Sequence, residues 1–214
     1  QLNWSNQKIN KNFGFIFDNE ANLRVTSISI DEKSRSDTSN IRFYPQLSSK
    51  ISYPLLKSSL LFNQTLTPII MPIFAPYNNY TEAQTITNSN IFSTNRATSF
   101  DEWESGPRIN YGIEWFINSA KGTDIRTVIG QNYRFNKLSN DTNSEISDYF
   151  INSNININLE NYLDSSLIID RDDLKIRSLN ANSFNKFGDL IFAVNYDYTS
   201  GKYNTSAEQV SVGG

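Results

Sequence analysis

The feature that most constrains this chain is a strict alternation of large apolar and polar residues over segments of about 10 to 14 residues. In the clearest segment, Arg108, Asn110, Gly112 and Glu114 alternate with the apolar positions Ile109, Tyr111, Ile113, Trp115 and Ile117. Successive side chains of a β-strand point to opposite sides, so this period of two predicts a strand with one apolar and one polar face. Segments 124–135, 151–160 and 189–199 have the same pattern.

Strands of this kind occur in a half-exposed sheet in water or in a transmembrane barrel, whose apolar face meets lipid and whose polar face lines a lumen. Their length favours the barrel, because ordinary strands have about 5 to 6 residues and membrane-crossing strands need about 9 to 11. Aromatic residues near the segment ends suit the membrane interfaces: Trp115, Tyr133, Phe135, Tyr149, Tyr196 and Tyr198. We therefore predict an all-β fold, an antiparallel up-and-down transmembrane β-barrel segment.

Composition and charge narrow the function classes. The mean hydropathy of -0.48 fits a membrane barrel, because only alternate residues of such a barrel face lipid. The net charge of -3 argues against a nucleic-acid partner. The chain has no Cys and no His, so disulfides, thiolate nucleophiles, Ser-His-Asp triads and nearly all zinc sites are excluded. We expect no catalytic residue, cofactor or metal, and hence no enzyme.

The pattern predicts about eleven long strands in one barrel domain over residues 1–214. Their ranges are 13–18, 21–31, 39–54, 57–76, 106–118, 122–136, 147–160, 162–172, 174–185, 188–200 and 203–212. Segments 32–38, 77–105 and 137–146 are long connections, and 19–20, 55–56, 119–121 and 186–187 are short turns. Outer-membrane barrels have long external loops and short periplasmic turns, so loops 77–105 and 137–146 should share the external side. Shifts of phase predict bulges between Val25 and Ile28 and between Ile176 and Leu179.

The beginning of the sequence also carries an expectation. It starts with Gln1 and has no charged segment followed by an apolar one, although an outer-membrane protein needs a signal peptide for export. We therefore expect a processed protein or a piece of a longer one.

One loop and the strands after it contain a series of motifs. Residues 90–96 read Asn-Ile-Phe-Ser-Thr-Asn-Arg and are followed by Phe100-Asp101, then by Glu-Ser-Gly-Pro-Arg-Ile-Asn-Tyr-Gly at 104–112, and by Val-Ile-Gly-Gln-Asn-Tyr-Arg at 128–134. Together with the proline-marked strands upstream, this order resembles the LPS-assembly protein (LptD) family over roughly residues 40–200.

The resemblance implies a translocon of the cell outer membrane that inserts lipopolysaccharide into the outer leaflet. The partners that it implies are lipopolysaccharide, membrane lipid, an LptE-like lipoprotein plug in the lumen, and a periplasmic LPS-transport bridge that reaches the family's N-terminal periplasmic domain. That domain and the strands at the barrel seam have no counterpart in this sequence, so the chain should form part of a larger barrel.

Two groups of candidate site residues follow. The family-motif loop contributes Asn90, Phe92, Asn95, Arg96, Phe100, Asp101 and Gly106. Within this loop, Arg96, Asp101 and Glu102 either belong to a plug folded into the lumen, contact lipid A phosphates, or tie the loop to itself and to the barrel wall, and we favour the last role. The lumen-facing polar track consists of Arg108, Asn110, Glu114, Asp124, Arg126, Asn132 and Arg134. Its charges either bind a sugar headgroup or pair across strands, and we again favour the second role. We interpret the recurrence of Asn at 152–158 as a bias in amino-acid composition that indicates little about function.

The turn Asn118-Ser-Ala-Lys-Gly122 predicts a register for the hairpin around it. Gly122 suits positive φ in a short loop, and pairing residue 118 with residue 122 places Glu114 opposite Arg126. We expect an ion pair between these two side chains on the polar face.

Two other function classes stay open: another outer-membrane barrel such as a porin-like diffusion channel, and a soluble all-β adhesin or glycan-binding module whose apolar faces pack together. In a membrane barrel a set of apolar residues points outward to lipid, whereas in a soluble all-β module the same residues are buried against a second sheet. This set is Ile109, Tyr111, Ile113, Trp115, Ile117, Ile125, Ile129, Ile155, Ile157, Leu159, Leu190, Phe192 and Val194.

Overall fold

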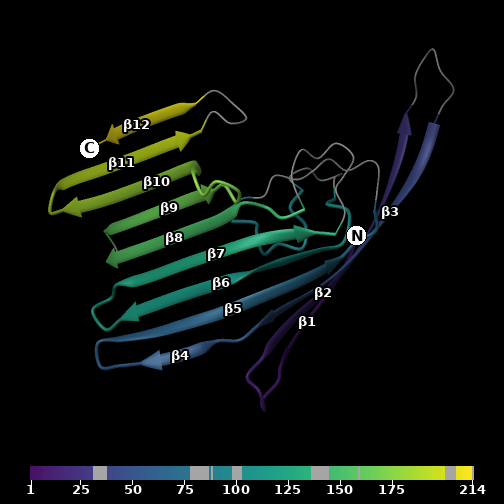
Figure 1. Ribbon diagram of the computed structural model, residues 1–214, viewed down its shortest axis with the longest axis horizontal. Helices are drawn as coiled ribbons and strands as arrows, with labels where there is room; N and C mark the ends of the chain where they lie inside the picture. Colours follow the sequence, from purple (N-terminus) through teal and green to yellow (C-terminus); the bar gives the residue numbers. More distant parts are fainter. Residues whose placement is uncertain are drawn as a thin grey trace.

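The computed structural model describes residues 1–30, 38–77, 87, 89–97, 103–135, 145–158, 160–200 and 206–213, and its regular structure there is entirely β (Figure 1). The strands are β1 (Leu2–Ile9), β2 (Ile16–Ile30), β3 (Thr38–Ser52), β4 (Leu55–Ser58), β5 (Phe62–Phe74), β6 (Arg108–Ser119), β7 (Asp124–Arg134), β8 (Tyr149–Asn158), β9 (Asn161–Ile169), β10 (Ile176–Phe187), β11 (Leu190–Thr199) and β12 (Ala207–Gly213). No helix of this part of the chain is long and apolar enough to cross a membrane.

The strands form a single antiparallel sheet in up-and-down order, as predicted. Each strand pairs with its neighbours in sequence, except that β3 and β4 both pair with β5. Within the described residues, β1 pairs only with β2 and β12 only with β11, so the sheet is open at both sides (Figure 1). An open meander of this kind is consistent with part of a larger barrel.

The N-terminal strands differ from the prediction. The short turn at 19–20 is wrong, because residues 18–20 lie inside β2 and pair with β1 on one side and β3 on the other. Their polar side chains have cross-strand partners: Gln7 donates to Asp18 at 2.5 Å, and Ser49 donates to Asn19 at 2.8 Å. The sequence pattern does not predict strand β1, and it predicts a turn where a polar segment in fact pairs with a strand on each side.

The turn predicted at 55–56 is also wrong. Pro54 interrupts the strand only locally, because β3 before it and β4 after it pair with successive parts of the same strand, β5. The chain reverses instead at 59–61, where the Ser59 amide donates to the Phe62 carbonyl at 2.9 Å. Leu60 is 98 % exposed at this turn, and its apolar character concealed the reversal in the sequence pattern.

Of the two predicted bulges, one is confirmed. The register of β9 and β10 shifts between Ile176 and Ser178. The bulge predicted between Val25 and Ile28 is wrong, because β2 pairs with β3 without interruption through these residues. A change of side-chain pattern can occur in a strand without a change in its hydrogen-bond register.

The apolar face of the sheet has no second layer in the described part of the chain. Every residue predicted to point outward is at least partly exposed, apart from Leu159, which lies outside the described residues. Ile113 and Trp115 are each 42 % exposed. The burial against a second sheet that a soluble sandwich requires is therefore not found here.

The opposite, polar face carries the small core of the molecule. Residues 89–97 and 103–107, from the connection between β5 and β6, lie against this face over β3 and β5–β7 (Figure 1). The buried apolar side chains lie mainly between this loop and the sheet: Tyr44, Ile69, Met71, Ile73, Ile91 and Trp103.

The prediction that the β5–β6 and β7–β8 connections lie on the same side of the sheet is confirmed. The Gly106 amide donates to the Pro76 carbonyl at 3.2 Å, and the Phe135 amide donates to the Pro107 carbonyl at 3.3 Å. The β5–β6 and β7–β8 connections therefore leave the sheet at the same end of the strands. The described part of the first one folds over the polar face.

Candidate functional site

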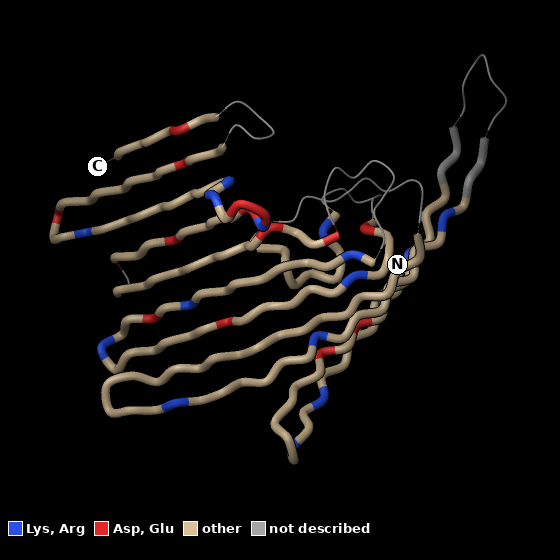
Figure 2. Tube along the Cα trace, in the orientation of Figure 1, with Lys and Arg blue, Asp and Glu red and all other residues tan. Residues whose placement is uncertain are grey.

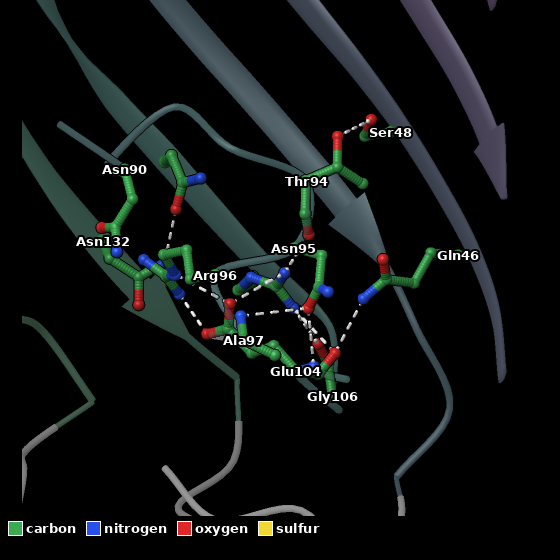
Figure 3. Close-up of polar contacts among 12 residues, drawn as sticks. Gln46, Ser48, Asn90, Thr94, Asn95, Arg96, Ala97, Glu104, Gly106 and Asn132 are labelled. Carbon is green, nitrogen blue, oxygen red and sulfur yellow. Dashed lines mark hydrogen bonds and ion pairs between the residues drawn. The ribbon is translucent and has the colours of Figure 1, made fainter. Parts of the chain in front are cut away.

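A buried carboxylate lies at the centre of the contact between loop and sheet. Glu104 belongs to the loop and forms ion pairs with Arg96 of the same loop, Arg108 at the start of β6 and Arg134 at the end of β7 (Figure 3). Arg96 Nε donates to Glu104 Oε2 at 2.7 Å, and Arg108 Nη2 lies 3.1 Å from the same oxygen. We call these four residues the loop clamp. Blue and red segments lie close together at this point of the trace (Figure 2).

The charges of the clamp are almost completely removed from water. The side chains of Glu104, Arg96 and Arg108 are 0 % exposed and that of Arg134 is 8 % exposed. Burial by itself raises the pKa of the Glu104 carboxyl, but the three guanidinium groups together lower it by more than burial raises it. The net pKa therefore lies below the ordinary value of 4.5. Glu104 is therefore ionised at neutral pH and neutralises part of the surrounding positive charge.

Backbone carbonyls accept hydrogen bonds from Arg108 of the clamp. Arg108 donates to the carbonyls of Thr94 and Gly106, the second at 3.3 Å. Gln46 of β3 donates to the Glu104 carbonyl at 2.8 Å. Buried charges are tolerated only when ion pairs and hydrogen bonds replace their hydration, and the clamp supplies both.

The local sequence shapes the loop for this contact. The Asn95 side-chain oxygen accepts from the Glu104 amide at 3.0 Å and from the Ala97 amide at 3.3 Å, which joins the two described segments of the loop. Gly106 has a φ of 84°, a conformation that favours glycine, and it lets the chain turn from Glu104 into β6.

The loop is also anchored on the first strands. The hydroxyls of Thr94 and Ser48 of β3 are 2.9 Å apart, and Thr94 donates to the Glu20 carboxylate of β2 at 2.5 Å. Contacts from β2, β3, β6 and β7 therefore converge on a few residues of one loop, and Figure 3 shows the contact of Thr94 with Ser48.

Two glycines pair across β6 and β7 where close contacts leave no room for a side chain. A Cβ atom at Gly130 would lie 3.0 Å from the Ile91 side chain and 3.4 Å from that of Phe92. A Cβ atom at Gly112 would lie 2.0 Å from the Ile129 carbonyl oxygen, which is backbone and cannot give way cheaply. The absence of a side chain at Gly130 lets the loop approach the sheet closely, and its absence at Gly112 lets β6 and β7 approach each other.

The seven residues of the predicted polar track all lie on the polar face, but they form separate groups. Arg108 and Arg134 belong to the clamp, and next to them Asn132 donates to Asn110 at 2.6 Å. Nearer the opposite ends of these strands, Arg126 donates to Glu114 at 2.8 Å, and Asn118 donates to Asp124. Of the charged members, all of which are described, only Glu114 and Arg126 pair with each other across strands, whereas Arg108 and Arg134 pair with Glu104 of the loop and Asp124 accepts from Asn118.

The family-motif loop is described only in part. Asn90 accepts from the Thr87 amide at 2.7 Å, Phe92 lies against Gly130, and Asn95, Arg96 and Gly106 build the clamp region. Phe100, Asp101 and Glu102 lie outside the described residues. For Arg96, the contact with Glu104 matches the predicted role of tying the loop to itself and to the wall.

The predicted hairpin register is wrong by two residues, although the predicted ion pair forms. Asn118 pairs with Asp124, so Val128 rather than Arg126 lies opposite Glu114. Gly122, with a φ of 87°, is the third residue inside the turn instead of the residue that closes it. The Glu114–Arg126 pair is therefore diagonal, a separation that long side chains can span.

The central residue of the clamp, Glu104, was not among the predicted site residues. The available signal was its place four residues before Arg108 in the motif Glu-Ser-Gly-Pro-Arg. Sequence spacing could not show that Arg96 and Arg134 converge on the same carboxylate. Among the described residues, no group of His, Cys, Asp and Glu could hold a metal ion. The ion pairs of the clamp fasten the loop to the sheet.

Comparison with known protein families gives a match over nearly the whole chain. A family model described as LptD, LPS transport system D, matches residues 3–212, which include residues of all twelve strands. No curated protein matches the chain.

Proposed function

The chain belongs to the LptD family of LPS transport, and we propose that its sheet is part of the wall of an outer-membrane β-barrel through which lipopolysaccharide reaches the outer leaflet. The family-level role is transport of lipopolysaccharide to the outer membrane by a protein that is not an enzyme. In this proposal the apolar face meets membrane lipid and the polar face lines the lumen.

The division between the two faces supports this placement. Apolar side chains stay exposed on one face of a single sheet, as at Ile129 and Phe192, which are 44 % and 48 % exposed. An exposed apolar area that covers a whole sheet is unusual in a monomeric soluble protein and marks a surface for lipid or a partner. Since a barrel has no unpaired edges, β1 and β12 would pair with further strands of a larger barrel.

The observation that carries the proposal furthest is the loop clamp. It fastens the described part of the β5–β6 connection against the polar face, which would narrow the lumen over β3 and β5–β7. Because long connections of outer-membrane barrels lie outside the cell, the clamp would be at the external end of the route. A fixed internal loop leaves a defined path beside it for a large amphipathic substrate.

The proposed partners follow the family. They are lipopolysaccharide, an LptE-like lipoprotein plug in the lumen, and a periplasmic LPS-transport bridge that delivers the substrate through an N-terminal domain. A porin-like channel would share the strand pattern, and the family match favours lipopolysaccharide transport over it.

The test is depletion of the full-length protein in its own cells, with measurement of lipopolysaccharide at the cell surface and in the inner membrane. The proposal expects loss of surface lipopolysaccharide and its accumulation in the inner membrane, both reversed by the wild-type copy. Normal surface lipopolysaccharide with altered permeability to small solutes would contradict it and support a diffusion channel.

A further inference from the structure

The half of the polar face that the described loop leaves uncovered carries two rows of amide, carboxylate and hydroxyl side chains. In the first row, cross-strand pairing aligns Asn154 of β8, Asp164 of β9, Asn182 of β10 and Asn195 of β11. In the second row it aligns Asn152, Ser166, Asn180 and Asp197 on the same four strands. We call the two rows together the amide belt.

Pairing across the sheet places the belt on the same face as the clamp. Asn154 pairs with Arg126 of β7, and Arg126 shares its face with Arg134 because the two residues are an even number apart in one strand. All eight residues of the belt are partly exposed, whereas the clamp is buried. The belt is thus the accessible part of a face whose other part the loop covers.

Hydrogen bonds hold the belt side chains in place. Asn154 donates to Asp164 at 2.7 Å, Asn182 donates to Asn180 at 2.8 Å, and Asn195 donates to Asp197 at 2.7 Å. Each amide and carboxylate has more donors or acceptors than these contacts use. The belt therefore presents fixed polar groups with remaining hydrogen-bonding capacity, the arrangement that hydroxyl-rich ligands need.

The charge of the belt selects among possible ligands. The belt contains two carboxylates and no cation, and few charged segments lie along β8–β12 (Figure 2). The cations of these strands are Arg177 and Lys186, near strand ends, and they form ion pairs with Asp148 and Glu160. A phosphate or an acidic sugar would meet repulsion in the belt, whereas neutral sugar hydroxyls can both donate to its carboxylates and accept from its amides.

We propose that the amide belt is a contact surface for neutral sugar residues of the lipopolysaccharide glycan as it passes the clamp. This inference rests on the proposed function, because it assumes that the polar face lines the route of lipopolysaccharide. It adds which part of the face touches the glycan, and which sugars it accepts. The belt runs across the strands, so a glycan that moves along them meets both rows in succession.

The experiment is photo-crosslinking in living cells with the full-length protein. A photoreactive amino acid replaces Asn154 or Asn182 in the belt and, as matched controls, Ser153 or Ala181, the preceding residues on the opposite face. Each variant is expressed in cells that make the complete glycan and in cells whose glycan is truncated to its acidic inner sugars. A further probe at Glu114 reports the lumenal face away from the belt.

The proposal expects crosslinks to lipopolysaccharide at Asn154 and Asn182, several-fold stronger than at Ser153 and Ala181, and their loss when the glycan is truncated. Crosslinks that persist with the truncated glycan, or that go to a protein instead, would overturn it. If the Glu114 probe captures lipopolysaccharide and the belt probes do not, the belt proposal fails and the proposed function stands. If none of the lumenal probes captures lipopolysaccharide, the proposed function itself fails.

Discussion

Two regions of one sheet accommodate the polar side chains of the same face in different ways. Over β3–β7 a loop covers the polar face and buries Glu104 with three arginines, whereas over β8–β11 the polar face stays accessible and is built from amides with few charges. Both regions follow the same alternation of apolar and polar residues. The difference shows that alternation determines which side chains share a face, and that a loop decides whether the face is buried or open.

The largest predicted effect is in the clamp. Glu104→Gln keeps the shape of the side chain but leaves three arginines without a carboxylate, two of them fully buried, so we expect destabilisation of about 3 to 5 kcal/mol. Urea unfolding of the full-length protein and protease cleavage of residues 89–97 measure it. The matched control is Asp164→Asn in the belt, which should cost less than about 1 kcal/mol because its carboxylate is partly exposed. Equal effects of the two substitutions would remove the distinction between the regions.

A smaller effect is predicted for the close contact of β6 and β7 at Gly112. Gly112→Ala places a methyl group against the Ile129 carbonyl and should cost about 1 to 3 kcal/mol, because backbone must shift. Gly213→Ala in β12 is the control, since nothing lies within 4 Å of its added Cβ atom. The same urea unfolding measurement compares them, and an unchanged midpoint for Gly112→Ala would mean that β6 and β7 approach less closely than described.

The clamp should also respond to acid more than the belt does. The folded-state pKa of Glu104 lies below 4.5, so its contribution to stability is complete above that ordinary value and is lost as the pH falls through the lowered pKa. Protease accessibility of residues 89–97, followed from pH 6 downward, should rise only below about pH 4.5. In Glu104→Gln this acid-dependent step should be absent, and a step that persists there would have to come from another group.

The smallest predicted effect concerns the exposed diagonal pair between the two regions. A double-mutant cycle on Glu114→Gln and Arg126→Gln should give a coupling energy of about 0.2 to 1 kcal/mol, because the two side chains are 30 % and 56 % exposed. Raising the salt concentration should weaken it further. A coupling comparable to the effect of Glu104→Gln would show that exposure does not separate the two kinds of ion pair.

Sequence predicted what depends on local pattern. Alternation identified the strand class, the two faces and the long connections, and the positive φ of Gly122 follows from the turn sequence. Local pattern failed where neighbours in space supply what the segment lacks, as at residues 18–20, whose polar side chains are bonded across strands. It also misplaced the turn at Leu60, where an apolar residue is fully exposed.

The candidate site was predictable only as separate pieces. Arg96, Arg108 and Arg134 were all singled out, but no spacing rule brings residues from a loop and two strand ends to one carboxylate. The hairpin register failed by two residues because the turn sequence does not say whether Gly122 closes the loop or lies inside it. Both failures concern the distance between elements, which only the folded chain defines.

The division of the polar face into a covered and an open half is tested most directly by labelling of single cysteines in the full-length, otherwise cysteine-free protein in intact outer membranes. A small water-soluble thiol reagent is applied to Asn132→Cys under the loop and to Asn154→Cys in the belt. Asn132 is 1 % exposed and Asn154 is partly exposed, so we expect rapid labelling at 154 and almost none at 132. Equal labelling at both positions would contradict a polar face that the clamp divides into a covered and an open half.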